Sequence, residues 1–322
     1  MKPPSKAPDA RTSLSWAGLI HLLVVYVVWG STFLAIRVAV RAGSGFPPFW
    51  MGTSRVLIGG VVLLGWAALR RQRIRPTSHE LRVLAASGVC LWFGGNGLVT
   101  WAETHADSGF AALVFGSMPL WAALMEALLE RRAPPARLLV SILIGLTGVA
   151  LLSAPVLGRR QPGDAASVVA LFLSAISWAA GTILQRRRPV AVVPQVSAAY
   201  QQLSAGVAYA TAALLSREPW PQPTNEALAA WGYLVVIGSI FAFTSYVAAV
   251  QLLPTRIVVT HAYVNPLIAV LLGAVVLREP VTGWTLAGLT CILAGVAGVF
   301  RQTAKGDNVA GRSGHQPSAL IR

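Results

Sequence analysis

Three ionisable side chains, Arg55, Glu103 and His261, stand within or at the end of long apolar stretches of the sequence. An ionisable group in an apolar, lipid-embedded helix costs at least a few kcal/mol, so each is a candidate for function. The Arg55 guanidinium could anchor a carboxylate or act as a gate charge, or it could pair with an acidic neighbour such as Glu103. Glu103 could equally be a solvated carboxylate at the rim.

His261 precedes Tyr263, Asn265 and Pro266 in one apolar stretch. Proline inside a helix frees a main-chain carbonyl, so this polar group is a candidate substrate or proton site. Packing against a neighbouring helix would explain the same residues. Pro119 stands at the matching place in the first half of the chain, and both prolines are predicted to be hinges.

Trp29 and Trp178 fall near the middle of their apolar stretches, whereas tryptophan normally collects at the membrane–water interface. A buried indole N–H requires an acceptor, which favours a wet cavity beside both rings over simple core packing. The other residues expected along this pathway are Thr32, Asn96, Trp101, Tyr200 and Gln201.

The composition places these residues in a lipid bilayer. Of the 322 residues, 55% are hydrophobic and 11% charged, and the mean hydropathy is +0.63. A soluble domain carries about 25% charged residues, and a disordered chain is more polar still. At about 20 residues per membrane-spanning helix, the length accommodates ten spans and no sizeable soluble domain.

Ten apolar segments are predicted to be membrane-spanning helices, which makes this an all-α integral membrane protein. They cover residues 16–40, 48–69, 81–101, 109–129, 138–156, 166–184, 193–215, 227–252, 257–277 and 283–300. The expected organisation is a cytoplasmic tail (1–15), a first repeat (16–156), a periplasmic linker (157–165), a second repeat (166–301) and a second cytoplasmic tail (302–322).

The formal net charge of +15 is carried mainly by short runs between the apolar segments. Alternate loops hold 19 and 5 Lys and Arg residues, and the richer set marks the cytoplasmic side, together with both termini. Nucleic-acid binding would require a clustered basic face on a soluble element, so that class is excluded.

The two five-segment halves resemble each other at matching positions. Trp29 corresponds to Trp178, Pro119 to Pro266, and the pair Gly145 and Gly148 to Gly295 and Gly298. Because five is an odd number of spans, the second half crosses the membrane in the opposite sense. Such inverted repeats are typical of alternating-access transporters, with a duplicated scaffold as the alternative.

Motifs of other function classes are missing from the sequence. It holds no HExxH, no phosphate-binding loop and no pair of intramembrane aspartates, and its two cysteines lie in apolar segments. We therefore expect neither an enzyme nor a cofactor or metal site.

The sequence resembles the drug/metabolite transporter superfamily, EamA type, and within it the YedA-like exporters. The resemblance covers roughly residues 18–301 and rests on Trp29–Phe33, Arg55, Asn96–Glu103, Ser108–Leu113 and Met118–Leu120. It implies a bacterial inner-membrane exporter with ten helices in two inverted repeats around a shared cavity.

The expected function is export of small metabolites, with amino acids as a candidate class, by alternating access, as a monomer or homodimer. Proton coupling is an open possibility, with Glu103 or His261 as the proton site. The alternatives are a multidrug exporter of lipophilic cations, which Arg55 disfavours, and a non-transporting scaffold or sensor.

Overall fold

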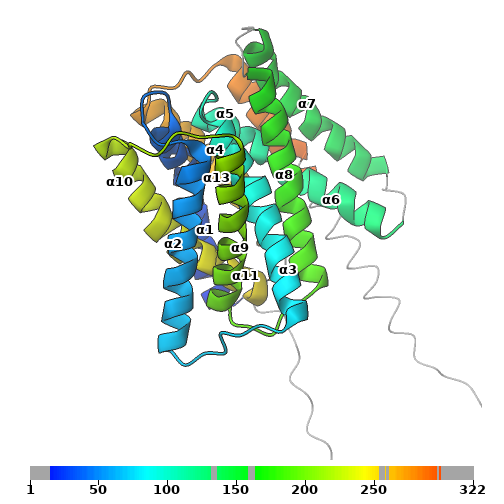
Figure 1. Cartoon of the computed structure of the whole chain (residues 1–322). Coiled ribbons are helices and arrows are strands. Elements are labelled where there is room, and N and C mark those ends of the chain that lie inside the picture. The colour runs from blue at the N-terminus through cyan, green and yellow to red at the C-terminus, as the bar shows by residue number, and fades with distance from the viewer. Residues whose placement is uncertain are drawn as a thin grey trace, which may run out of the picture.

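The computed structural model is a bundle of helices without strands in the described part of the chain, namely residues 15–131, 136–158, 164–253, 258, 261–295 and 297–298 (Figure 1). The first half contains α1 (Trp16–Val40), α2 (Pro48–Leu69), α3 (Ser78–Gly88), η1 (Val89–Gly97), α4 (Leu98–Ala102), α5 (Ser108–Phe115), α6 (Met118–Leu129) and α7 (Ala136–Gly158). The second half contains α8 (Asp164–Arg187), α9 (Pro194–Leu215), α10 (Asn225–Tyr233), η2 (Leu234–Ala242), α11 (Phe243–Leu252), α13 (His261–Val276) and a last helix, Gly283–Gly295.

These elements form the ten expected spans. The third span is the continuous run of α3, η1 and α4, the fourth is α5 with α6, and the eighth is α10, η2 and α11. Within the described residues, six spans are both long and apolar enough to cross a membrane by themselves, and shorter or less apolar helices supply the others. The predicted all-α, ten-helix architecture is confirmed.

Local sequence signals place the helix ends. The Ser15 hydroxyl caps α1, and Thr77 with Glu80 forms a reciprocal capping box at the start of α3. Helices α2 and α9 both begin with proline, whose fixed φ suits the first helical turn.

Four spans end in an arginine with left-handed backbone, at matching places in the two halves. Arg71 follows α2 and Arg217 follows α9, while Arg131 follows α6 and Arg278 follows α13, with φ between 52° and 56°. Glycine usually occupies this position because a Cβ is disfavoured there. A guanidinium instead complements the negative end of the helix dipole.

The glycines that match between the two repeats lie at a close helix crossing. A Cβ on Gly295 would come within 2.6 Å of the main chain of Ser141 and Gly145, and one on Gly148 within 2.7 Å of the Gly288 carbonyl. These residues therefore lie where α7 crosses the last helix. The glycine spacing serves contacts within the chain at this crossing.

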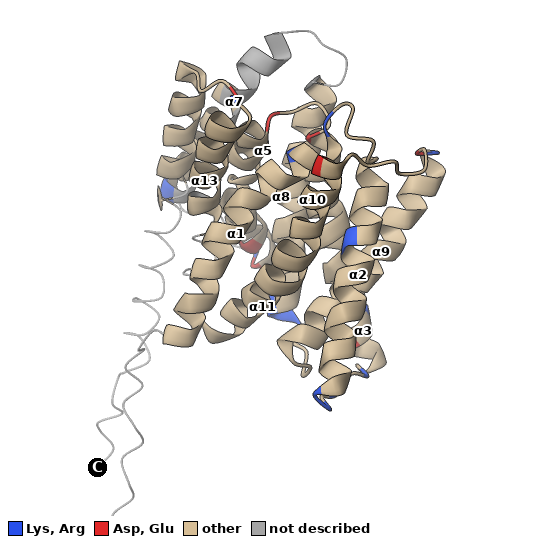
Figure 2. Cartoon of the chain, turned by 90° about the vertical axis from the view of Figure 1, so that its left-hand side faces the viewer, with Lys and Arg blue, Asp and Glu red and all other residues tan. Residues whose placement is uncertain are grey.

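The two ends of the bundle differ in chemistry (Figure 2). One, the arginine-rich end, carries Arg70–Arg75 after α2 and Arg186–Arg188 at the end of α8. The opposite end is the glutamate-capped end, where two glutamates of the second half of the chain accept hydrogen bonds from the N-termini of two helices of the first half. Glu218 accepts from Phe49 and Trp50 N–H at 3.1 and 3.0 Å at the start of α2.

Glu279 makes the second cap, at the start of α5. Its carboxylate accepts from Ser108 N, Ser108 Oγ and Gly109 N at 2.8–3.2 Å. The unsatisfied N–H groups and the positive dipole end of a helix favour a carboxylate there.

We expect the Glu279→Ala variant to lose about 1–2 kcal/mol of stability, because the start of α5 is left uncapped. The measurement is thermal unfolding of purified protein in detergent. The control is Glu226→Ala, because Glu226 forms an exposed ion pair with Arg41, and such pairs contribute about 0–1 kcal/mol. Equal shifts for the two variants would contradict the capping role.

Burial raises the pKa of Glu218 above its ordinary value, although the N–H donors of Phe49 and Trp50 act in the opposite direction. A raised folded-state pKa means that the stability contributed by this group is present in acid and is lost as pH rises through that pKa. We therefore expect the stability of wild type relative to Glu218→Gln to fall as pH rises from about 4 to about 7. Unfolding of both proteins in detergent over this pH range measures it. A constant difference would show that Glu218 does not titrate differently on folding.

Candidate functional site

Two π-helical segments lie at matching positions in the middle of the third and eighth spans. These are η1 (Val89–Gly97) and η2 (Leu234–Ala242). A π-helical turn breaks the regular i→i−4 ladder and is found mostly at functional sites. In η1 the carbonyls of Cys90 and Trp92 accept hydrogen bonds from Ser177 Oγ and Tyr209 OH, both at 2.8 Å.

The second segment, η2, is held by similar bonds. Gln202 Nε2 donates to the Ser239 carbonyl at 3.1 Å, and Ser239 Oγ donates to the Leu234 carbonyl, five residues back, at 2.9 Å. The two segments present Asn96 and Ser239 to one guanidinium, that of Arg55 on α2.

Arg55 is 2% exposed. Its Nε donates to Ser239 Oγ at 2.8 Å, its Nη1 donates to Asn96 Oδ1 at 3.1 Å, and its guanidinium carbon lies 5.1 Å from the centre of the Trp92 ring. Among the described residues, ion pairs within 4.0 Å join only Arg41 to Glu226, Arg73 to Glu80 and Arg186 to Glu126. The Arg55 cation therefore has neutral partners, and an anion would complete its surroundings.

An aromatic cluster lies beside Arg55. The Trp29 ring meets Trp178 edge-on at 5.4 Å and tilts against Tyr246 at 4.8 Å, and Phe115 meets Trp178 at 5.5 Å. The indole nitrogen of Trp92, which also lines the cavity beside Arg55, has no hydrogen-bond partner in the described structure. An unpaired indole donor beside a cavity favours occupation by a polar group.

A cavity of about 40 Å³ lies between Arg55 and these rings. Each buried water needs about 10–15 Å³, so it holds a few waters, whereas ligand pockets measure about 300–1,000 Å³. The cavity is therefore too small for a metabolite in this conformation, and loading it requires helices to separate. The lining residues are Trp29, Thr32, Phe33, Ile36, Arg55, Trp92, Asn96, Val99, Phe115, Trp178 and Asn265.

The second half contributes His261 and Asn265 of α13. His261 is 1% exposed, and its ring meets Trp29 edge-on at 5.3 Å. Asn265 Nδ2 lies 3.3 Å from His261 Nδ1, and His261 Nε2 and Asn265 Oδ1 have no partner among the described residues. The side chain of Tyr263 is outside the part of the structure that is described.

Other predicted pathway residues lie elsewhere. Tyr200 OH donates to the Ile74 carbonyl near the arginine-rich end, and Gln201 Nε2 donates to Ser87 Oγ in the buried core. Neither lines the cavity. Pro119 stands in the first turn of α6 just after the turn at Gly116–Ser117, whereas Pro266 is inside α13.

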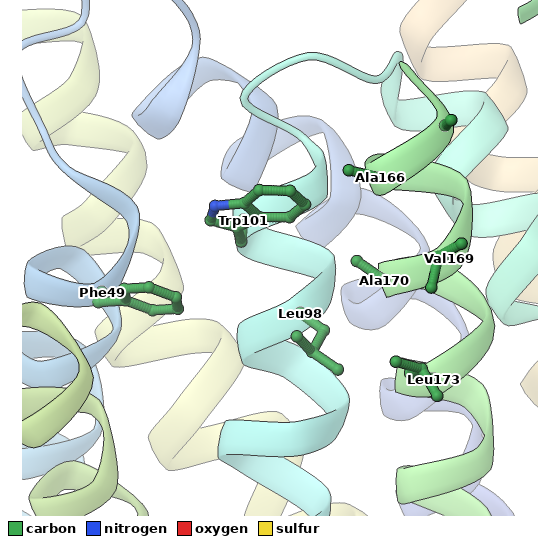
Figure 3. A pocket seen from close by; sticks show the side chains of 8 residues that line it. Phe49, Leu98, Trp101, Ala166, Val169, Ala170 and Leu173 are labelled. Carbon is green, nitrogen blue, oxygen red and sulfur yellow. The ribbon is translucent and has the colours of Figure 1, made fainter. Parts of the chain in front are cut away.

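Trp101 faces a second space, an apolar groove of about 500 Å³ between α2, α4 and α8. Figure 3 shows its ring between Phe49 of α2 and Ala166 of α8, with Leu98 below. Every lining residue is apolar or aromatic. Trp101 and the cavity residues Asn96 and Val99 thus lie on different faces of one span.

Glu103 follows α4 and is 0% exposed, so it is not a solvated rim carboxylate. Neither of its carboxylate oxygens has a hydrogen-bond partner among the described residues. Arg37 reaches it from α1, but Nη1 donates to the Glu103 main-chain carbonyl, at 2.5 Å.

Several site residues were not predicted. Ser239 is one hydroxyl in a strongly apolar run, and Trp92, Phe115 and Tyr246 resemble ordinary core aromatics. Ser239 and Trp92 lie in the π-helical segments, whose changed period alters which side chains face inward. Hydropathy carries no signal of that change.

Comparison with known proteins identifies the family of this helical bundle. The model of the EamA-like transporter family matches residues 16–154 and again residues 165–301. The chain belongs to the EamA-like transporter family. It is therefore a multi-pass membrane transporter with a small-molecule substrate, not an enzyme, and the family predicted from the sequence is confirmed.

Relatives of this EamA-like transporter include YedA, an uncharacterized inner membrane transporter of Escherichia coli K12. It is 32% identical over 254 residues, 78% of this chain and 80% of YedA. A probable terminal-alkyne amino-acid exporter of Streptantibioticus cattleyicolor is 29% identical over 106 residues, about a third of each chain. One crystal structure, at 23% identity, covers 89% of this chain and 96% of its own with a TM-score of 0.61, which supports the fold.

Proposed function

We propose that this protein is a secondary transporter that exports small carboxylate-bearing metabolites, such as amino acids, by alternating access. The observation that carries the proposal is Arg55, a buried cation at the cavity whose hydrogen bonds go to two neutral side chains. A guanidinium has five N–H donors in a planar fork that matches a carboxylate. A substrate carboxylate would supply the missing negative charge.

The cavity lining supports an amphipathic substrate. Trp29, Phe33, Phe115 and Trp178 offer an apolar, aromatic surface to a side chain. Thr32, Asn96 and Asn265 add polar groups that could orient the head group, and the Asn265 carbonyl oxygen is unpartnered. The similarity to a probable amino-acid exporter points to the same substrate class.

The proposed setting is the bacterial inner membrane, with the arginine-rich end and both termini in the cytoplasm. The named relative YedA is an inner membrane transporter, and the excess of arginine at this end follows the positive-inside rule. The glutamate-capped end then faces the periplasm.

The activity is tested by counterflow in proteoliposomes with labelled amino acids and other metabolites. Saturable exchange of a carboxylate compound supports the proposal. A lipophilic cation tests the multidrug alternative, which Arg55 disfavours by charge. Folded protein that exchanges none of the carboxylate compounds would contradict the proposed substrate class.

We expect the Arg55→Ala variant to raise the half-saturating concentration for a carboxylate substrate about 10- to 100-fold, the range for losing about 1.5–3 kcal/mol of hydrogen bonding to a charged group. Counterflow over a concentration series measures it. Arg55→Lys keeps the charge without the fork and should be intermediate.

Arg41→Ala is the matched control, because Arg41 is exposed and pairs with Glu226. Its affinity should equal that of wild type. Normal carboxylate transport by folded Arg55→Ala would contradict the anchor role.

A further inference from the structure

Glu103 is a buried acid that the carboxylate anchor does not use. It is 0% exposed, and neither oxygen has a partner among the described residues. An ionised carboxylate without donors in an apolar interior is so unfavourable that such a group takes up a proton instead. In this conformation the neutral acid is therefore the form that fits.

Glu103 lies one helical turn beyond the cavity-lining residues of the third span. Trp92, Asn96 and Val99 line the cavity from the third span, at steps of four and three residues. Glu103 comes four residues after Val99, so it continues the same face one turn toward the glutamate-capped end.

Arg37 and Arg55 attract the Glu103 carboxylate electrostatically, but neither donates a hydrogen bond to it in the described structure. Arg37 of α1 donates to the main-chain carbonyl, and Arg55 of α2 is held by Asn96 and Ser239. Glu279, after α13, caps α5 and adds a like charge. From α8, Ser167 donates to the Ala102 carbonyl and brings no charge.

Resting on the proposed function, we propose that Glu103 is the carboxylate for which the ammonium group of an amino-acid substrate and a proton compete. In the empty carrier Glu103 holds the proton. When a zwitterion binds, its carboxylate pairs with Arg55, the Glu103 O–H bond breaks, the proton leaves to water and the ammonium pairs with the carboxylate. The proton and the substrate exclude each other, so each zwitterion exported is exchanged for one proton moving inward.

The spacing suits such a substrate once the cavity opens. Asn96, which holds Arg55, and Glu103 are seven residues apart, about 10 Å along a helix. An arginine side chain, an amino-acid head group and a glutamate side chain together bridge that gap. The Glu103 carboxylate also restores charge balance, because the loaded site holds two cations and two anions.

The first experiment uses the wild-type protein in weakly buffered detergent at pH 7 with a pH-indicator dye. The probes are leucine and 2-hydroxy-4-methylpentanoate, which keeps the carboxylate and apolar side chain but lacks the ammonium. We expect leucine to release about one proton per bound molecule, and the hydroxy acid to bind without release. Equal release by both compounds would overturn the proposal.

The second experiment compares variants in proteoliposomes. With an acidic interior, wild type should accumulate external leucine as protons leave. Glu103→Gln should still exchange leucine, with lower affinity, but should lose both the accumulation and the proton release. Glu103→Asp, which keeps a titratable acid, should retain both in part.

The matched control is Glu126→Gln, because Glu126 is a half-exposed carboxylate paired with Arg186 at the arginine-rich end. It should behave as wild type. Proton release that persists in Glu103→Gln overturns the proposal. Wild-type leucine exchange that does not respond to the pH gradient also overturns it, but leaves the proposed amino-acid transport intact. A wild type that exchanges no amino acid overturns the proposed function.

Discussion

The buried guanidinium of Arg55 is the constraint on which the centre of this bundle depends. A buried guanidinium in a low-dielectric interior needs hydrogen-bond acceptors or an aromatic face on several sides. The structure supplies them from two elements: η1 provides Asn96 and the face of Trp92, and η2 provides Ser239. Both π-helical segments of the described chain therefore converge on one side chain. Their irregular backbone is stabilised in turn by Tyr209, Ser177 and Gln202.

Much of the fold could be predicted, because a bilayer imposes simple rules on sequence. Length, apolar runs and the repeated positions of Trp29 and Trp178 were enough to predict ten spans in two inverted halves. Trp29, Arg55 and Asn96, expected on one pathway, do line one cavity. Each is conspicuous as a polar or aromatic group at membrane depth.

What could not be predicted depends on local backbone geometry and on which face a residue occupies. Ser239 reaches Arg55 because η2 is π-helical, a feature without a hydropathy signal. Trp101 is five residues from Asn96 yet faces the apolar groove, and Tyr200 binds a loop carbonyl near the arginine-rich end. Sequence distance along a helix does not determine orientation when the helical period changes midway.

The two halves share a skeleton but not their polar groups. Arg55 and Gln201 are both the eighth residue of a helix that starts with proline, and the π-helical segments also correspond. Yet the cavity cation belongs to the first half, whereas His261 and Asn265 belong to the second. A repeated skeleton allows two related conformations that open to opposite sides. Under the proposed function, the same Arg55 serves the substrate from both sides, because the polar groups of the cavity are not repeated, and the helices move around a site whose chemistry stays in place.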